Sequence, residues 1–317
     1  MHLLIAHAAP PGPQCQAAIP RLQLPRLTAL LKSLQAVQQR NSSPAAMTPL
    51  YEHIQADLAG MDAADGLVPW AALDARRLGL VNAANASGGW AWITPCHWRV
   101  NADHVEMQDP AALALTAQES ATLVDAMRGY FAEDGITLHP LPGPRADAWL
   151  AEGAVLKGLP TTSLARARGA RVDRWMPRQP QAKPLRRLQN EMQMLLYTHP
   201  LNDTRQAAGQ TTVNSFWVSG TGELPANFRL DTAHAAPDDC TLNTSLRDAA
   251  LADDATTWLA LWHTLDATVL ANAKGIEQLT LCGEHQAHTL ARQPGAWWRS
   301  LLRRFTAPTP AQLIATL

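Results

Sequence analysis

Hydrophobic and polar positions follow two different periods along the chain, which predicts a protein of mixed α/β class. Short apolar runs such as Leu3-Leu4-Ile5 and Leu279–Cys282 have the length of buried strands. Longer stretches place an apolar residue at every third or fourth position, which is typical of amphipathic helices. We expect such helices at residues 24–37, between Thr116 and Gly135, from Leu185 to Tyr197, and at residues 257–270. The polar, proline-bearing residues 38–49 predict a surface loop, and residues 50–80 predict helical pieces broken at Gly60, Gly66 and Pro69.

Residues 90–155 differ from the segments on either side in their pattern of apolar and polar positions, which predicts several short strands around one helix. Residues 90–100 and 104–107 predict two strands of a hairpin, and residues 136–139 and 147–150 predict two more strands. Between the two pairs, Thr116 and Glu119 form a T-x-x-E capping box, which marks the start of a helix. We therefore expect residues 90–155 to form a small inserted α+β subdomain, and residues 1–89 and 156–317 to form the α/β core.

The stretch from Arg186 to Pro225 concentrates polar groups between two predicted elements. Its helix carries an apolar face and, on another face, a polar stripe of Arg186, Asn190, Gln193 and Tyr197. Pro200 cannot continue the helix, so His199 is predicted near the C-terminal end of that helix. A loop with Asn202, Asp203 and Arg205 is expected next, followed by a strand over residues 213–218 and a turn at residues 219–222.

Within that loop, His199, Asn202 and Arg205 are candidate binding residues. A guanidinium, a carboxamide and an imidazole within seven residues suit the orientation of a carboxylate or phosphate. The alternative is structural: Asn202 and Asp203 cap a turn and Arg205 is solvated. Spacing alone does not decide between them.

Two further patterns have a structural interpretation that we favour. Gly220-Thr221-Gly222 lacks the third glycine of a dinucleotide fingerprint, so a turn with positive φ is the better prediction. His97, Asp103 and His104 flank the predicted hairpin turn and could hold a metal, but loosely placed residues of this kind are more often ordinary polar residues.

Composition and charge restrict the classes of partner. The formal net charge is −1, with 47% hydrophobic and 17% charged residues, so we expect neither nucleic acid nor a membrane surface as partner. The apolar and basic residues 297–305 predict a closing helix whose arginines face solvent. Scattered Cys15, Cys96, Cys240 and Cys282 form no metal knuckle, and without a signal pattern or an apolar span we expect a cytoplasmic location.

The stretch from His199 to Pro225 resembles a motif of the archaeal-type cofactor-independent phosphoglycerate mutases. The matching positions are His199-Pro200-Leu201-Asn202, Arg205, Gly209, Asn214, Gly220, Gly222 and Pro225. Thr212, Val213 and Ser219 depart from the motif. The resemblance implies an alkaline-phosphatase-like layered sheet with helices, and a small phosphorylated or carboxylate ligand held by His199, Asn202, Arg205 and Asn214.

The chain also resembles the RpfE-type regulatory proteins of proteobacteria, which are described as phosphoglycerate mutase-like. That resemblance covers nearly the whole length. It is carried by the segments MHLLI at residues 1–5, TPCHW at 94–98, LQNEMQMLLYTHPLN at 188–202 and VNSFW at 213–217.

The positions at which these mutases carry their metal ligands are altered in this chain. The mutases carry two divalent metals, usually manganese or zinc, and need an acidic residue directly after the first strand. Here Ala6-His7-Ala8-Ala9 follows that strand, and Glu284-His285-Gln286-Ala287 stands where the family has D-H-S-T. Only His7, Glu284 and His285 remain as candidate ligands, so we expect no cofactor.

Three functions remain in view. The favoured one is a non-catalytic regulatory or ligand-sensing protein with a degenerate metal site, a pseudoenzyme. The alternative is an active metal-dependent mutase or phosphatase that uses His7, Glu284 and His285 with manganese or zinc. The third is a protein-interaction module that uses exposed tryptophans, with a protein as partner.

Overall fold

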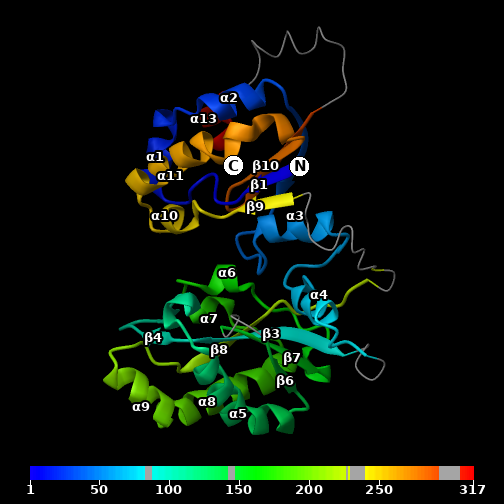
Figure 1. Ribbon diagram of the computed structural model, residues 1–317, viewed down its shortest axis with the longest axis vertical. Coiled ribbons are helices and arrows are strands. Elements are labelled where there is room, and N and C mark those ends of the chain that lie inside the picture. Colours follow the sequence, from blue (N-terminus) through cyan, green and yellow to red (C-terminus); the bar gives the residue numbers. More distant parts are fainter. Residues whose placement is uncertain (83–87, 142–146, 226–227, 229–239, 293–307) are drawn as a thin grey trace. The chain divides into compact units, whose positions relative to one another are not determined.

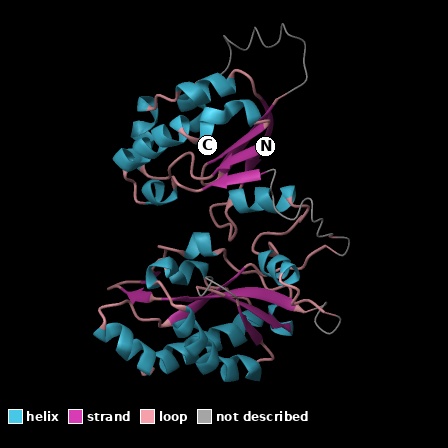
Figure 2. Ribbon diagram, in the orientation of Figure 1, coloured by secondary structure: helices cyan, strands magenta, loops and turns pink. Residues whose placement is uncertain are grey.

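The computed structural model describes residues 1–82, 88–141, 147–225, 228, 240–292 and 308–317. The chain divides into two compact units, each with its own sheet and core. Unit 1 comprises Met1–Ala45, Pro49–Ala59 and Leu230–Leu317, and unit 2 comprises Ala46–Thr48 and Gly60–Arg229. Both units contain helices and strands (Figure 2), which confirms the mixed α/β class. Among the described residues, no helix combines the length and apolar character needed to cross a membrane.

Unit 1 is built on a five-stranded sheet in the order β2-β11-β10-β1-β9. Strand β1 (His2–Ile5) runs parallel to β9 (Cys240–Asn243) and to β10 (Gln278–Cys282), so that Ile5 lies beside Leu281 and Asn243. Strands β11 (Gln286–Ala291) and β2 (Gln35–Asn41) extend the sheet in antiparallel fashion. The carboxyl ends of the parallel strands therefore share one edge, where ligands often bind in open α/β sheets.

One face of this sheet carries the main core of unit 1. Leu3, Ile5, Leu279 and Leu281 point to that face, as the period of two along a strand requires. Helices α1 (Pro13–Ala18), α2 (Pro25–Leu31), α11 (Ala255–Ala267) and α13 (Pro310–Ile314) cover it, and Figure 1 shows them gathered on one side of β1 and β10. Unit 1 also contains α3 (Leu50–Leu58), which packs against β11, and α10 (Arg247–Leu251).

Unit 2 is built on a four-stranded antiparallel sheet in the order β6-β7-β3-β8. These strands are β3 (Gly89–Cys96), β6 (Thr137–Pro140), β7 (Trp149–Gly153) and β8 (Ser215–Ser219). Every residue of β3 is buried, because apolar layers cover both of its faces. A separate hairpin pairs β4 (Trp98–Val100) with β5 (Val105–Met107), which confirms the predicted hairpin turn. The strand predicted over residues 90–100 is divided into β3 and β4, and β3 pairs with β7 and β8 instead of β5.

Two long helices cover one face of the unit 2 sheet. Ile93, Trp149 and Phe216 meet the apolar sides of α5 (Ala117–Glu133) and α8 (Lys183–Tyr197) there (Figure 1). On the other face, Trp90 and Trp92 pack with α4 (Trp70–Arg77). Unit 2 also contains the shorter helices α6 (Leu164–Ala167), α7 (Val172–Trp175) and α9 (Pro200–Ala207). The capping box of Thr116 and Glu119 starts α5, which confirms that prediction.

Several predicted elements differ from the structure. The helix expected over 24–37 ends at Leu31, and Gln35–Asn41 forms edge strand β2 in place of a loop. Most β2 side chains are exposed, so no apolar alternation marks the strand in the sequence, and its pairing with β11 decides its conformation. The loop expected after His199 is helix α9, because proline at its first position suits a helix start.

The sheet of unit 2 joins residues 90–155 to a segment far along the chain. Strand β8 pairs with β3 over Trp92–Cys96, with Trp92 beside Ser219. The sequence-based division placed β8 in the surrounding core, whereas the contacts group it with residues 60–229. The predicted closing helix at 297–305 lies outside the described part of the chain.

Candidate ligand-binding pocket

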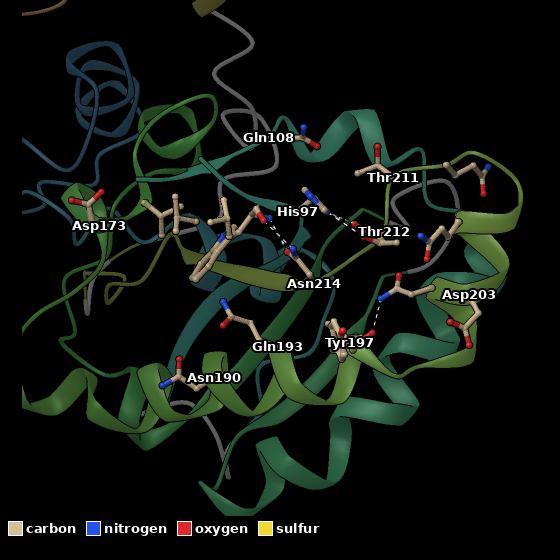
Figure 3. A pocket seen from close by; sticks show the side chains of 18 residues that line it. His97, Gln108, Asp173, Asn190, Gln193, Tyr197, Asp203, Thr211, Thr212 and Asn214 are labelled. Carbon is tan, nitrogen blue, oxygen red and sulfur yellow. Dashed lines mark hydrogen bonds between the residues drawn. The ribbon is translucent and has the colours of Figure 1, made fainter. Parts of the chain in front are cut away.

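Unit 2 contains a pocket of about 840 Å³. It is lined by hairpin β4–β5, helices α7, α8 and α9, and the segment that leads into β8 (Figure 3). Carboxamides dominate its polar lining: Gln108, Asn190, Gln193, Asn202, Gln206, Gln210 and Asn214. The volume lies in the usual range for small-molecule sites.

Helix α8 forms one wall of the pocket. Its apolar side, including Leu188, Met192 and Leu196, is buried in the unit 2 core and fixes the helix. The polar stripe singled out in the sequence supplies Asn190, Gln193 and Tyr197, which Figure 3 shows rising from α8 toward Asn214 and His97. Arg186, the fourth member of the stripe, donates instead to the carbonyl oxygen of Pro177 at 2.9 Å.

The side chain of Asn202 fixes the floor of the pocket. Its Nδ2 donates to the carbonyl oxygens of Leu196 (2.8 Å) and Val213 (2.6 Å), and its Oδ1 accepts from the Val213 amide (2.9 Å). The residue is 6% exposed, so these bonds lie away from water. Asn202 therefore ties the end of α8 to the segment before β8.

Asn214 and His97 join that segment to hairpin strand β4. Asn214 Oδ1 accepts from the Trp98 amide at 2.7 Å, and Asn214 Nδ2 donates to the Trp98 carbonyl oxygen at 2.9 Å. His97 Nδ1 lies 2.8 Å from the carbonyl oxygen of Thr212, and a carbonyl oxygen can only accept. In the neutral ring Nδ1 therefore carries the hydrogen, which leaves Nε2 as an acceptor.

The charged groups of the lining are carboxylates. Asp173 and Asp203 are both exposed and lie at opposite ends of the view in Figure 3. The hydrogen bond from Arg171 lowers the pKa of Asp173, so this carboxylate stays ionised at neutral pH. Within the described residues, the lining contains no lysine or arginine.

The residues predicted to bind a ligand have internal partners. His199 is the N-cap of α9, where its Nδ1 accepts from the Leu201 amide at 3.2 Å. Arg205 is only 1% exposed, so it is not solvated. It donates to the carbonyl oxygen of Thr211 (2.8 Å) and pairs with Glu119 (2.5 Å). Asn202 and Asn214 line the pocket, whereas His199 and Arg205 do not.

The candidate metal ligands share one edge of the unit 1 sheet. His7 follows β1, and Glu284 and His285 lie in the turn between β10 and β11; the Ala8 amide donates to the Cys282 carbonyl oxygen at 2.7 Å. In the part of the chain that the structure describes, no group of three or more His, Cys, Asp or Glu side chains is arranged to hold a metal ion. In the hairpin, His104 pairs with Asp103 (2.7 Å), whereas His97 bonds to Thr212.

The Gly220-Thr221-Gly222 segment is a turn, as predicted. Gly220 and Gly222 have φ values of 68° and 141°. Thr221 is fully buried, and its hydroxyl donates to the Leu159 carbonyl oxygen at 2.6 Å. The segment therefore has a structural role.

Sequence reasoning missed part of the pocket. Gln108, which follows β5, and Asp173 of α7 lie in segments that carried no functional signal in the sequence, and only the fold brings them beside α8. The polar stripe on α8 was the available signal, because polar residues at i, i+3 and i+7 share one face of a helix.

Comparisons with known proteins gave distant structural neighbours only. No protein-family model and no curated protein matches the chain. The PH0037 protein from Pyrococcus horikoshii is similar at TM-score 0.47 and 13% identity, over 92% of this chain and 87% of that one. A cofactor-independent phosphoglycerate mutase from Thermoplasma acidophilum is similar at TM-score 0.36 and 15% identity, over 93% and 90%. At these scores the neighbours assign no residue role and no activity to this chain.

Proposed function

We propose that this chain is a ligand-sensing regulatory protein that binds a small molecule in the unit 2 pocket. The observation that carries the proposal is that some pocket amides are bonded to the backbone whereas others have no side-chain partner. Asn202 and Asn214 hold the backbone, and so fix the shape of the pocket. Gln108, Asn190 and Gln193 have no side-chain hydrogen bond to another group within the described structure. A fixed floor with available polar groups lowers the cost of ordering on binding.

The test is a ligand screen by thermal unfolding, followed by an activity assay. A ligand present at one hundred times its Kd stabilises the folded protein by about 2.7 kcal/mol. The proposal expects such a ligand, and expects no conversion of 3-phosphoglycerate to 2-phosphoglycerate with added manganese. Failure of every compound to raise the unfolding midpoint would overturn it. Clear turnover that is lost on chelation would also overturn it.

A second candidate function is metal-dependent phosphoglycerate mutase or phosphatase activity at the edge of the unit 1 sheet. His7 has a φ of 55°, an uncommon conformation for a residue other than glycine, and such backbone strain is often kept at functional sites. The Glu284-His285 turn lies at the same edge. In this alternative, His7, Glu284 and His285 would hold manganese or zinc, which would neutralise phosphate charge.

Metal content decides between the two candidates. Elemental analysis of protein purified without chelators, compared with a His7→Ala variant, measures whether metal is bound there. Bound metal that His7→Ala removes, together with chelator-sensitive turnover, favours the second candidate. Absence of metal in the wild-type protein after reconstitution rejects it.

The interaction-module hypothesis loses its main support within the described structure. The tryptophans described there are buried or half-buried, from Trp70 to Trp262, and none is exposed. Trp297 and Trp298 lie outside the described residues. A protein partner, which a regulatory protein would act on, stays part of the proposal, and so does the cytoplasmic location expected from the sequence.

A further inference from the structure

We infer that the unit 2 pocket takes a neutral polyhydroxyl ligand of the saccharide class. This inference rests on the proposed function, and it revises the ligand chemistry that the sequence suggested. A phosphate or carboxylate would need a cationic partner. The pocket, as far as the structure describes it, offers carboxamides, hydroxyls, one imidazole and two carboxylates.

Carboxamides match the hydrogen-bonding character of sugars. Each side-chain amide presents one acceptor oxygen and two donor hydrogens, and each sugar hydroxyl likewise donates and accepts. Gln193 of α8 and Gln108, which follows β5, are half-buried, and the exposed Asn190 lies one turn before Gln193 on α8. Three amides with no side-chain partner in the described structure can pair with several adjacent hydroxyls.

Tyr197 adds a flat apolar surface beside those amides. Its side chain is 85% exposed at the edge of the pocket, although exposure of a large aromatic ring to water is unfavourable in free energy. Because Tyr197 follows Gln193 by four positions, both lie on the same side of α8. A sugar ring can stack its C–H face on Tyr197 while its hydroxyl edge reaches Gln193.

Charge favours neutral over anionic ligands. Asp203 is exposed at one end of the lining, and at the other end Asp173 already accepts a hydrogen bond from Arg171. A phosphate placed in the pocket would face one free carboxylate and no free cation of the lining. Like charges repel, so the carboxylates of this lining disfavour a phosphate.

The experiment measures binding of a matched set of probes to the full chain by saturation-transfer difference NMR and calorimetry. The probes are glucose, glucosamine and glucose 6-phosphate, with maltotriose as an extended neutral ligand and a panel of other neutral monosaccharides. The expected result is binding of neutral sugars, with glucose 6-phosphate at least about tenfold weaker than glucose. Tyr197→Ala should weaken the binding of neutral sugars about tenfold, and Tyr197→Phe should retain it. Asp203→Asn should reduce the difference in affinity between glucose and glucose 6-phosphate.

Met194→Ala is the matched control, because Met194 lies on the same helix, is 77% exposed and does not line the pocket. Tighter binding of glucose 6-phosphate than of glucose would overturn the inference and leave the proposed function standing. Binding of a non-saccharide ligand in a Gln193-dependent way, while every sugar fails, would likewise overturn only the inference. If no sugar and no other small molecule binds, both the inference and the proposed function fail.

Discussion

Arg205 of α9 and Glu119 of α5 form an ion pair with 2.5 Å between Nη1 and Oε1, although 86 positions separate them along the chain. Glu119 at the same time closes the capping box of α5 with Thr116. The second oxygen of Glu119 accepts from Thr116, so one carboxylate serves both a helix start and a buried guanidinium. The pair therefore fixes α9, which contributes to the pocket wall, against α5.

Replacement of Arg205 should destabilise the protein strongly. Arg205→Met leaves Glu119 without its cation and the carbonyl oxygens of Leu113 and Thr211 without a donor. Breaking a buried pair from one side costs about 3–5 kcal/mol in the free energy of unfolding. Urea denaturation measures it, with Arg128→Met as control, because the Arg128–Asp125 pair is exposed and its loss should change stability by less than about 0.5 kcal/mol.

The same ion pair predicts a pH dependence of stability. Burial alone would raise the pKa of Glu119, but hydrogen bonds from Thr116 and Arg205 outweigh it, so the folded-state pKa is lowered from 4.5. Because the pKa of Glu119 is lower in the folded state, the unfolded state takes up a proton at a higher pH as the pH falls. The stabilisation of the folded protein by ionised Glu119 is therefore complete above pH 4.5, and it is lost as the pH falls through the folded-state pKa.

Glu119→Gln removes the charge and the acceptor for Arg205, while its remaining amide oxygen can still close the capping box with Thr116. The stability difference between wild type and Glu119→Gln should be largest near neutral pH and should shrink below pH 4.5. Denaturation curves recorded from pH 7 to pH 3 test it. A difference that stays constant over this range would show that the charge of Glu119 contributes nothing.

Replacement of Asn202 should lower the stability of the folded protein, because its side chain is bonded to the backbone. Asn202→Ala removes three buried hydrogen bonds and leaves the Val213 amide unsatisfied, with an expected loss of about 1–3 kcal/mol. Gln206→Ala, an exposed position on the same helix, should leave stability nearly unchanged. Equal unfolding midpoints for both variants would contradict the assigned role of Asn202.

Gly222 should tolerate no side chain. Its φ is 141°, and a Cβ atom there would collide with the carbonyl oxygen of Leu67. Gly60 also has positive φ, at 76°, but an added Cβ meets nothing within 4 Å. We expect Gly60→Ala to cost about 1–2 kcal/mol from backbone strain alone, and Gly222→Ala to cost about 3 kcal/mol or more. Similar losses in the two variants would mean that the turn can shift away from Leu67.

The sequence predicts those features that depend on neighbouring positions. The capping box of α5, the break at Gly66 and Pro69 and the two faces of α8 follow from spacing along one element. Strand β2 could not be predicted in this way, because Gln35–Asn41 is polar and is held by pairing with β11.

In the candidate site, too, the sequence predicts local features but not those that depend on distant parts of the chain. The stripe of Asn190, Gln193 and Tyr197 is visible in the sequence, and it forms one wall of the pocket. The partners of Asn202 and Arg205 are backbone groups and a carboxylate brought close only by the fold. Ligand-binding residues and structural residues therefore look alike in the sequence, and only their hydrogen bonds separate them.

The central claim is that the unit 2 pocket, with the α8 stripe as its wall, binds a small ligand. The direct test compares ligand-induced shifts of the unfolding midpoint in wild type, Gln193→Ala and Met194→Ala. Gln193 lines the pocket, whereas Met194 lies beside it in sequence and outside the pocket. The account predicts the same shift in wild type and Met194→Ala and a clearly smaller shift in Gln193→Ala. An equal shift in all three would place the ligand elsewhere and contradict the account.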